Sequence, residues 1–114
     1  MLRPPYTPVF DGDYYGKVNN CRGGATLEAV LLAYPNIERL LCGHVHRFMQ
    51  MRFGGTILVT APSTTTAIAL RLAPNAKPAS YVEPSAFLLH YWRGGSLSTH
   101  YVPIGTFPGP MPFF

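Results

Sequence analysis

Two histidines one residue apart, His44 and His46, are the residues of this chain best suited to chemistry. Imidazole is the commonest metal ligand among side chains. In an extended segment, residues i and i+2 point the same way with their Cα atoms about 7 Å apart, so both rings face one pocket while Val45 faces the packing side. At that spacing each ring is able to serve one ion of a close metal pair. The spacing alone equally allows two histidines that cap a loop or hydrogen-bond to the backbone.

The segment before the histidines has the character of a buried strand. It carries an apolar cluster that is too short for an independent helix. Gly43 follows the cluster and permits backbone angles that other residues avoid. The sequence therefore predicts a strand over residues 37–42 that presents the histidines at its carboxyl end. The cluster consists of Ile37, Leu40, Leu41 and Cys42.

Arg47 follows the histidines directly. A planar guanidinium can hold a phosphate through two parallel hydrogen bonds, which makes Arg47 a candidate substrate-binding residue. A surface ion pair is an equally good interpretation, because neighbouring residues of a strand point to opposite faces.

A helix is predicted before this strand. Apolar residues recur at the helical spacing i, i+3, i+4 and i+7 between residues 24 and 34. Pro35 ends the helix because proline cannot continue it. A helix followed closely by a strand is the step expected of a layered α/β structure. The apolar face consists of Leu27, Val30, Leu31 and Tyr34.

Two hairpins are predicted after the histidines. Gly54-Gly55 and Gly94-Gly95 are two-residue turn signals between segments that alternate or are rich in strand-forming residues. In the first hairpin, the row that contains Met49 and Met51 is expected in the core. His90 and His100 fall in the second hairpin and are expected to be hydrogen-bonded structural residues, not metal ligands. The predicted strands cover residues 47–53, 56–60, 86–92 and 97–102.

The remaining segments connect or flank these elements within one partial domain, residues 1–114. Residues 1–23 have no sustained period and are expected to form an extended loop, and the proline-rich residues 72–85 a connector between the 24–71 region and the 86–102 hairpin. The tail, residues 103–114, is too apolar to be solvated, and we expect it to fold back over the body or to reach across a subunit boundary.

Several short motifs, in order, give the chain a family resemblance. It resembles calcineurin-like metallophosphoesterases, and within them the bacterial class III cyclic-nucleotide phosphodiesterases and glycerophosphodiesterases. The motifs are Gly43-His44-Val45-His46-Arg47, Phe53-Gly54-Gly55-Thr56, Ala61-Pro62-Ser63-Thr64, Glu83-Pro84-Ser85-Ala86-Phe87-Leu88-Leu89-His90 and Ile104-Gly105-Thr106-Phe107-Pro108-Gly109-Pro110.

This resemblance implies a fold, a metal centre and a reaction. The fold is an α/β (α+β) one: the C-terminal half of a four-layer αββα sandwich, with mostly antiparallel strands and one main helix. Two ions, Fe, Mn or Zn, bind in the intact enzyme, where His44 is implied as a ligand of the second metal and His46 of the first. A hydroxide that bridges the ions attacks the phosphorus of a small phosphodiester, either a cyclic nucleotide or a glycerophosphodiester.

The resemblance also shows which parts of the family's site are missing from this sequence. The family's Asp-x-His, Gly-Asp-x-x-Asp and Gly-Asn-His motifs do not occur, and Asp11-Gly12-Asp13 is interpreted as a loop. Leu2-Arg3-Pro4-Pro5 resembles a remnant of a His-His-Pro-Pro motif without its histidines, and Thr66 stands where many members have another histidine. We expect the C-terminal part of a longer enzyme, inactive or nearly so by itself, because two imidazoles cannot hold two ions in catalytic geometry.

Composition limits the partners and leaves a second function open. Hydrophobic residues make up 47% of the 114 residues and charged residues 12%, so apolar surface is expected to meet the missing N-terminal half or a second copy. The formal charge of +4 is scattered, which argues against a nucleic-acid partner. The sequence lacks a membrane span or signal peptide, and a cytoplasmic location is expected. The alternative function is a non-catalytic oligomerisation or binding module that retains half of the fold.

Overall fold

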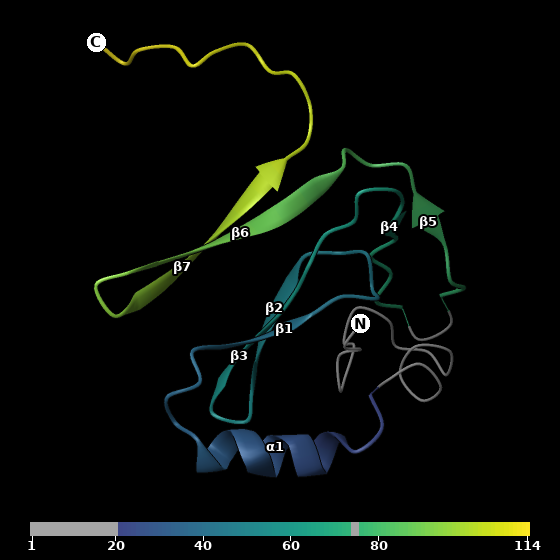
Figure 1. Cartoon of the computed structure of the whole chain (residues 1–114). Helices are drawn as coiled ribbons and strands as arrows, with labels where there is room; N and C mark the ends of the chain where they lie inside the picture. Colours follow the sequence, from purple (N-terminus) through teal and green to yellow (C-terminus); the bar gives the residue numbers. More distant parts are fainter. Residues whose placement is uncertain (1–20, 74–75) are drawn as a thin grey trace.

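A computed structural model describes residues 21–73 and 76–114. One helix and seven strands are found in these residues, in three small sheets (Figure 1). This confirms the predicted α+β class with mostly antiparallel strands, since the only parallel pair of strands in the described part joins β1 to β3. The elements are α1 (Gly24–Ala33), β1 (Arg39–Cys42), β2 (Met49–Phe53), β3 (Thr56–Thr60), β4 (Ala67–Ile68), β5 (Ser80–Tyr81), β6 (Ala86–Arg93) and β7 (Ser96–Pro103).

The central sheet has the strand order β1-β3-β2, and β3 is its most deeply buried strand. β3 lies in the middle, parallel to β1 and antiparallel to β2, and its Leu58 and Thr60 are fully buried. The first predicted hairpin is confirmed, with the positive φ angles of Gly54 and Gly55 forming its turn. Met49 and Met51 are partly buried while Gln50 is exposed, as the alternation predicts.

Helix α1 packs beside the turn between β2 and β3 (Figure 1). A Cβ added to Gly54 would lie only 2.6 Å from the Cβ of Leu31, which shows how closely helix and turn approach. The predicted four-residue apolar face is only partly correct. Leu31 is buried and Leu27 partly buried, but Val30 and Tyr34 are exposed, because the helix contacts the described chain along a narrow strip and not across a full face.

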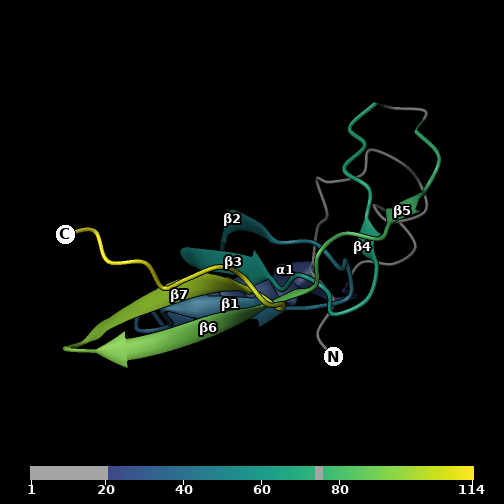
Figure 2. The same ribbon diagram turned by 90° about the horizontal axis from the view of Figure 1, so that it is seen from above.

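A short β4–β5 pair corrects the prediction for residues 72–85. Ser80 and Tyr81, in the middle of the expected connector, pair with Ile68 and Ala67. Two residues per strand are too few for a recognisable sequence period, so the pairing could not be predicted from alternation. Figures 1 and 2 place this pair at the end of the molecule away from the β6–β7 turn.

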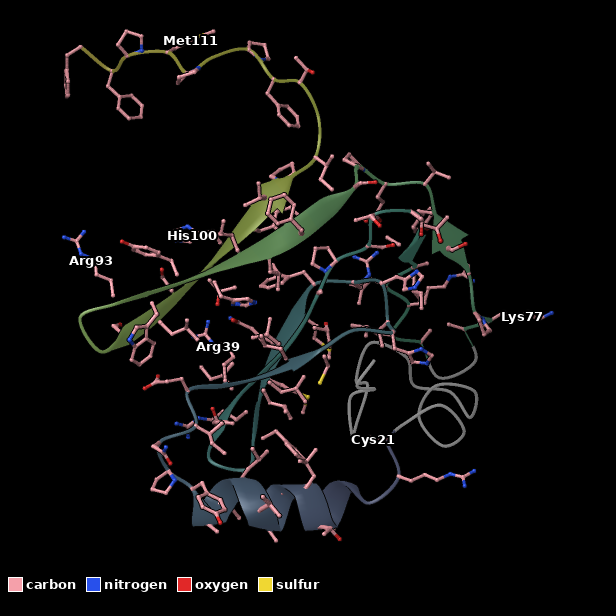
Figure 3. All side chains as sticks on the ribbon, viewed as in Figure 1. Cys21, Arg39, Lys77, Arg93, His100 and Met111 are labelled. Atoms are coloured by element: carbon pink, nitrogen blue, oxygen red, sulfur yellow. The ribbon has the colours of Figure 1, made fainter. Side chains whose placement is uncertain are left out.

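The second predicted hairpin, β6–β7, is confirmed; β6 is one residue longer than predicted at its carboxyl end, and β7 is one residue longer at both ends. It meets the central sheet through Arg39, whose guanidinium donates to the hydroxyl of Thr99 (Figure 3). A second contact is an edge-to-face ring pair between Phe48 and Tyr101, with centroids 6.0 Å apart. These two contacts hold the hairpin against the central sheet, and the second lies next to the histidines, because Phe48 follows His46 by two residues.

The tail beyond β7 runs away from the sheets (Figures 1 and 2). Its residues 104–114 are exposed, so in this structure the tail does not fold back over the body. A contact across a subunit boundary stays a prediction. The motifs near the amino terminus, Leu2-Arg3-Pro4-Pro5 and Asp11-Gly12-Asp13, lie outside the described residues, as does most of the predicted 1–23 loop.

Candidate functional site

The histidine loop, residues 43–48, crosses the carboxyl end of β3 on its way from β1 to β2. Thr60 fixes this crossing, because its buried hydroxyl donates to the carbonyl oxygen of Arg47 at 2.6 Å. The amide of Ala61 donates to the carbonyl oxygen of Cys42 at 2.9 Å. Val45 is fully buried beneath the loop, as predicted. The loop is therefore anchored at its start, middle and end.

Both histidines have left-handed backbone angles, with φ of 77° at His44 and 52° at His46. The amide of Val45 donates to the carbonyl oxygen of Gly43 at 3.0 Å, so His44 is the central residue of a strained γ-turn. The prediction of an extended His-x-His segment is therefore wrong: the chain turns here because the loop must cross β3. Each such residue costs about 1–3 kcal/mol, and strain of this kind collects at functional sites.

His46 is oriented by a backbone carbonyl. Its Nδ1 lies 3.0 Å from the carbonyl oxygen of Thr66. A carbonyl only accepts hydrogen bonds, so Nδ1 carries the proton and Nε2 keeps its lone pair. A carbonyl partner on the second ring nitrogen is the usual arrangement for a histidine that ligates a metal. Backbone bonding and metal binding, the two interpretations of the spacing, are thus compatible at His46.

His44 is placed differently from His46. The residue as a whole is partly buried, and its Nε2 atom is shielded from solvent. His44 therefore combines a strained backbone with a ring nitrogen that is buried. The two histidines occupy non-extended positions on either side of Val45.

Arg47 is held by two acceptors from distant parts of the chain. Its Nε donates to the carbonyl oxygen of Ile68 at 2.6 Å, and one of its terminal nitrogens lies 3.1 Å from Oε1 of Glu83. The ion pair considered as the alternative for Arg47 is therefore present. The two contacts use only two of the five N–H donors of the guanidinium.

A pocket of about 230 Å³ opens beside these residues. Its lining includes Tyr101 and the polar residues His46, Arg47, Glu83, Ser63 and Thr65. The pocket thus joins the histidine loop, the turn after β3, the segment after β5 and the β6–β7 hairpin. The structure brings His46 and Arg47 to one cavity, while His44 is not among the residues that line it.

The hydroxyl-rich turn after β3 serves the structure, as predicted. The hydroxyl of Ser63 accepts from the amide of Thr65 at 3.0 Å, and Ser85 donates to the carbonyl oxygen of Thr64 at 2.9 Å. These bonds join the turn to the start of β6, where the amide of Ala86 also donates to the carbonyl oxygen of Ser63.

The two other histidines make hydrogen bonds within the hairpin. Nδ1 of His90 lies 2.9 Å from the hydroxyl of Thr99, and Nε2 of His100 lies 3.2 Å from the hydroxyl of Ser98. The prediction that they are structural is consistent with these bonds.

Cys42 ends β1, two residues before His44. Burial raises the pKa of its thiol to about 11, and the nearby thiol of Cys21 adds to the effect. The side chain stays protonated at neutral pH and behaves as a small buried apolar group, as predicted.

Among residues 21–73 and 76–114, no three His, Cys, Asp or Glu side chains gather closely enough to hold a metal ion. The described residues therefore fit a two-metal centre only in part, through the two imidazoles. Nor does any described helix have the length and apolar character that a membrane span requires.

Glu83 and Thr60 are residues that sequence reasoning did not select for the site. Glu83 lies in one of the quoted motifs, but its contact with Arg47 spans 36 positions, and spacing does not report contacts at that separation. In the sequence, Thr60 is an ordinary strand residue. Its hydrogen bond to the carbonyl oxygen of Arg47 forms because the loop crosses β3.

Comparison with known proteins gives two kinds of relative. The chain is 38% identical over 111 residues to a probable glycerophosphodiester phosphodiesterase, GpdQ, of Arcobacter nitrofigilis, a match that covers 96% of this chain and 41% of the relative. It is 35% identical over 46 residues to the 3′,5′-cyclic adenosine monophosphate phosphodiesterase CpdA of Escherichia coli K12, covering 40% of this chain and 17% of that protein. No family model matches.

The chain spans about two fifths of the length of the first relative. The motifs predicted a resemblance to bacterial glycerophosphodiester and cyclic-nucleotide phosphodiesterases, and both kinds of enzyme are found among the matches. The predicted resemblance to these bacterial phosphodiesterases is therefore confirmed for this part of their length.

Proposed function

We propose that this chain is the C-terminal part of a metal-dependent phosphodiesterase of the calcineurin-like type. The observation that carries the proposal is the 38% identity to a probable glycerophosphodiester phosphodiesterase across almost the whole chain. The longer and closer of the two matches favours a glycerophosphodiester as the substrate, with a cyclic nucleotide as the alternative.

In the proposed site, His46 and His44 are metal ligands. The proton on Nδ1 of His46 supports this role, because it leaves Nε2 to face a ligand. When bound, a pair of ions supplies an activated hydroxide and neutralises charge on the phosphoryl group. The further ligands of two ions are then contributed from outside the described residues.

Arg47 is the proposed contact to the phosphodiester. Its guanidinium lines the same pocket as His46 and retains donors beyond those used by Ile68 and Glu83. Donors fixed in advance are suited to stabilising charge on a phosphoryl oxygen, because they need little reorganisation when the ligand binds.

A chimera tests the proposal. The segment of the Arcobacter relative that aligns with this chain is replaced by this chain, and hydrolysis of a glycerophosphodiester and of 3′,5′-cyclic AMP is measured with Mn²⁺. We expect hydrolysis, with a loss of at least about 100-fold in the variants His44→Ala and His46→Ala, since even outer partners of metal ligands are worth about 10–100-fold. His90→Ala is the matched control and should retain activity. Full activity in both ligand variants would contradict the proposal.

The second candidate is a non-catalytic oligomerisation or binding module. Exposed apolar side chains on several described elements favour it, among them Leu32, Leu41 and Leu89. A chimera that folds, binds metal and hydrolyses neither substrate would favour this candidate over the phosphodiesterase.

A further inference from the structure

Glu83 contacts the histidine loop although it lies far from the loop in the sequence. It follows β5 by two residues and lies 36 positions after Arg47. Its Oε1 is 3.1 Å from a terminal nitrogen of the guanidinium, with 20% of the Arg47 side chain and 42% of the Glu83 side chain exposed. An exposed ion pair of this kind contributes little to stability, on the order of 0–1 kcal/mol. Stability alone is therefore a weak reason for the contact.

The contact with Glu83 also fixes the orientation of the Arg47 guanidinium. Glu83 holds one terminal nitrogen of Arg47, while the carbonyl oxygen of Ile68 holds Nε at 2.6 Å. Because the guanidinium is planar, anchors on two of its three nitrogens fix the plane of the whole group. Two of the five N–H donors are used in this way, and three remain.

The fixed guanidinium lies at the pocket that His46 also lines. The carbonyl of Thr66, just before β4, orients His46, and that of Ile68, at the end of β4, holds Arg47. Immobilising an arginine side chain costs up to about 2 kcal/mol of rotamer entropy. A ligand that meets an arginine already held in place does not bear that cost again.

We propose that Glu83 is a positioning residue that fixes the Arg47 guanidinium to receive an oxygen of the phosphodiester. This inference rests on the proposed function. The carboxylate of Glu83 then strengthens the binding of an anion, because the order that it imposes on the Arg47 side chain outweighs its own repulsion of the anion. A purely electrostatic role has the opposite sign, since removal of a nearby negative charge strengthens anion binding.

Nuclear magnetic resonance of the 114-residue chain tests the proposal with dimethyl phosphate as the probe. The Nε–H signal of Arg47 reports the order of the side chain without any ligand, and its shift during titration reports the affinity. In Glu83→Ala we expect the Arg47 signal to become as mobile as that of the exposed Arg93, and the affinity for dimethyl phosphate to fall about 3–10-fold, which corresponds to roughly 0.7–1.4 kcal/mol. Amide signals of β3 should not move.

Two matched variants complete the test. Glu83→Gln keeps an oxygen acceptor without the charge and should restore part of the order and of the affinity. Glu28→Ala removes the same charge from the exposed surface of α1 and should change neither. An affinity that rises in both Glu83 variants, or an Arg47 signal that stays ordered in Glu83→Ala, would overturn the positioning role.

The outcomes separate this inference from the proposed function. If the unmodified chain binds dimethyl phosphate and Glu83→Ala binds it equally well, the positioning role fails while the phosphate site remains. If the unmodified chain shows an ordered Arg47 but dimethyl phosphate leaves its signal unchanged, the assignment of the pocket to a phosphodiester fails, and the positioning role for that ligand fails with it.

Discussion

Replacement of Gly54 by alanine tests how closely helix α1 is held against the sheet that carries the histidine loop. Gly54 has φ of +57°, and a Cβ at this position would lie 2.6 Å from Cβ and 2.9 Å from Cδ1 of Leu31. Gly94 provides the control. It occupies the same place in the β6–β7 turn with φ of +58°, and a Cβ there would meet nothing within 4 Å.

The two substitutions share one cost and differ in another. A left-handed backbone costs alanine about 1–2 kcal/mol at either site, offset by about 0.4–1 kcal/mol because alanine restricts the unfolded chain. Only Gly54→Ala also forces Leu31 to move, which adds about 1–3 kcal/mol for an overpacked contact. We therefore expect Gly94→Ala to lower the free energy of unfolding by about 1 kcal/mol, and Gly54→Ala by about 2–4 kcal/mol.

Urea unfolding followed by circular dichroism measures this difference. The slope of the free energy against urea should be the same in both variants, so that the midpoints report stability alone. A difference between Gly54→Ala and Gly94→Ala smaller than about 0.5 kcal/mol, the usual error of additivity, would refute the close packing of α1 against the β2–β3 turn.

Two further predictions concern the histidine loop and the strand before it. Thr60→Val removes the donor to the carbonyl oxygen of Arg47 and should lower the free energy of unfolding by about 1–2 kcal/mol. Thr56→Val, on the same face of β3, is the control for urea unfolding and should cost much less; equal costs would show that the Thr60 bond does not hold the loop. Because burial raises the pKa of Cys42 to about 11, its contribution to stability is full below the pKa of an unfolded thiol, about 8.5, and is lost as the pH rises toward 11. Measured from pH 8 to 11, the unmodified chain should lose more stability than Cys42→Ala, and iodoacetamide should modify Cys21 before Cys42; parallel pH curves would contradict the burial of this thiol.

Local signals in the sequence predicted much of the fold. Gly54-Gly55 and Gly94-Gly95 specified two hairpins, since glycine takes positive φ at both turn positions without strain. The helix ends at Ala33, just before Tyr34 and Pro35, as the missing amide of proline requires. These features depend on a few neighbouring residues, so the sequence alone was enough.

The features that the sequence did not predict depend on distant contacts. The strained angles of His44 and His46 arise because the loop crosses β3, and no local pattern reports that crossing. The contact between Arg47 and Glu83 joins two segments 36 positions apart. Residue types therefore identified the candidate site, while its geometry required the three-dimensional arrangement.

Exposed apolar surface is a further consequence of this arrangement. Leu41 and Ile57 lie on the sheet and Leu32 on the helix, all more than a third exposed. The described residues do not cover these side chains, which agrees with a chain that spans about two fifths of its relative.

A titration of the chain with Zn²⁺, followed through the ring nitrogen signals of its four histidines, tests the metal-binding role of the histidine loop. Zinc is chosen because it accepts imidazole readily. We expect the signals of His46 and His44 to shift on binding and the shift to be lost in His46→Ala, while His90 and His100 keep the signals set by their bonds to Thr99 and Ser98. Equal shifts at all four histidines, or zinc binding that survives His46→Ala unchanged, would contradict the assignment of the histidine loop as the metal-binding part of a phosphodiesterase.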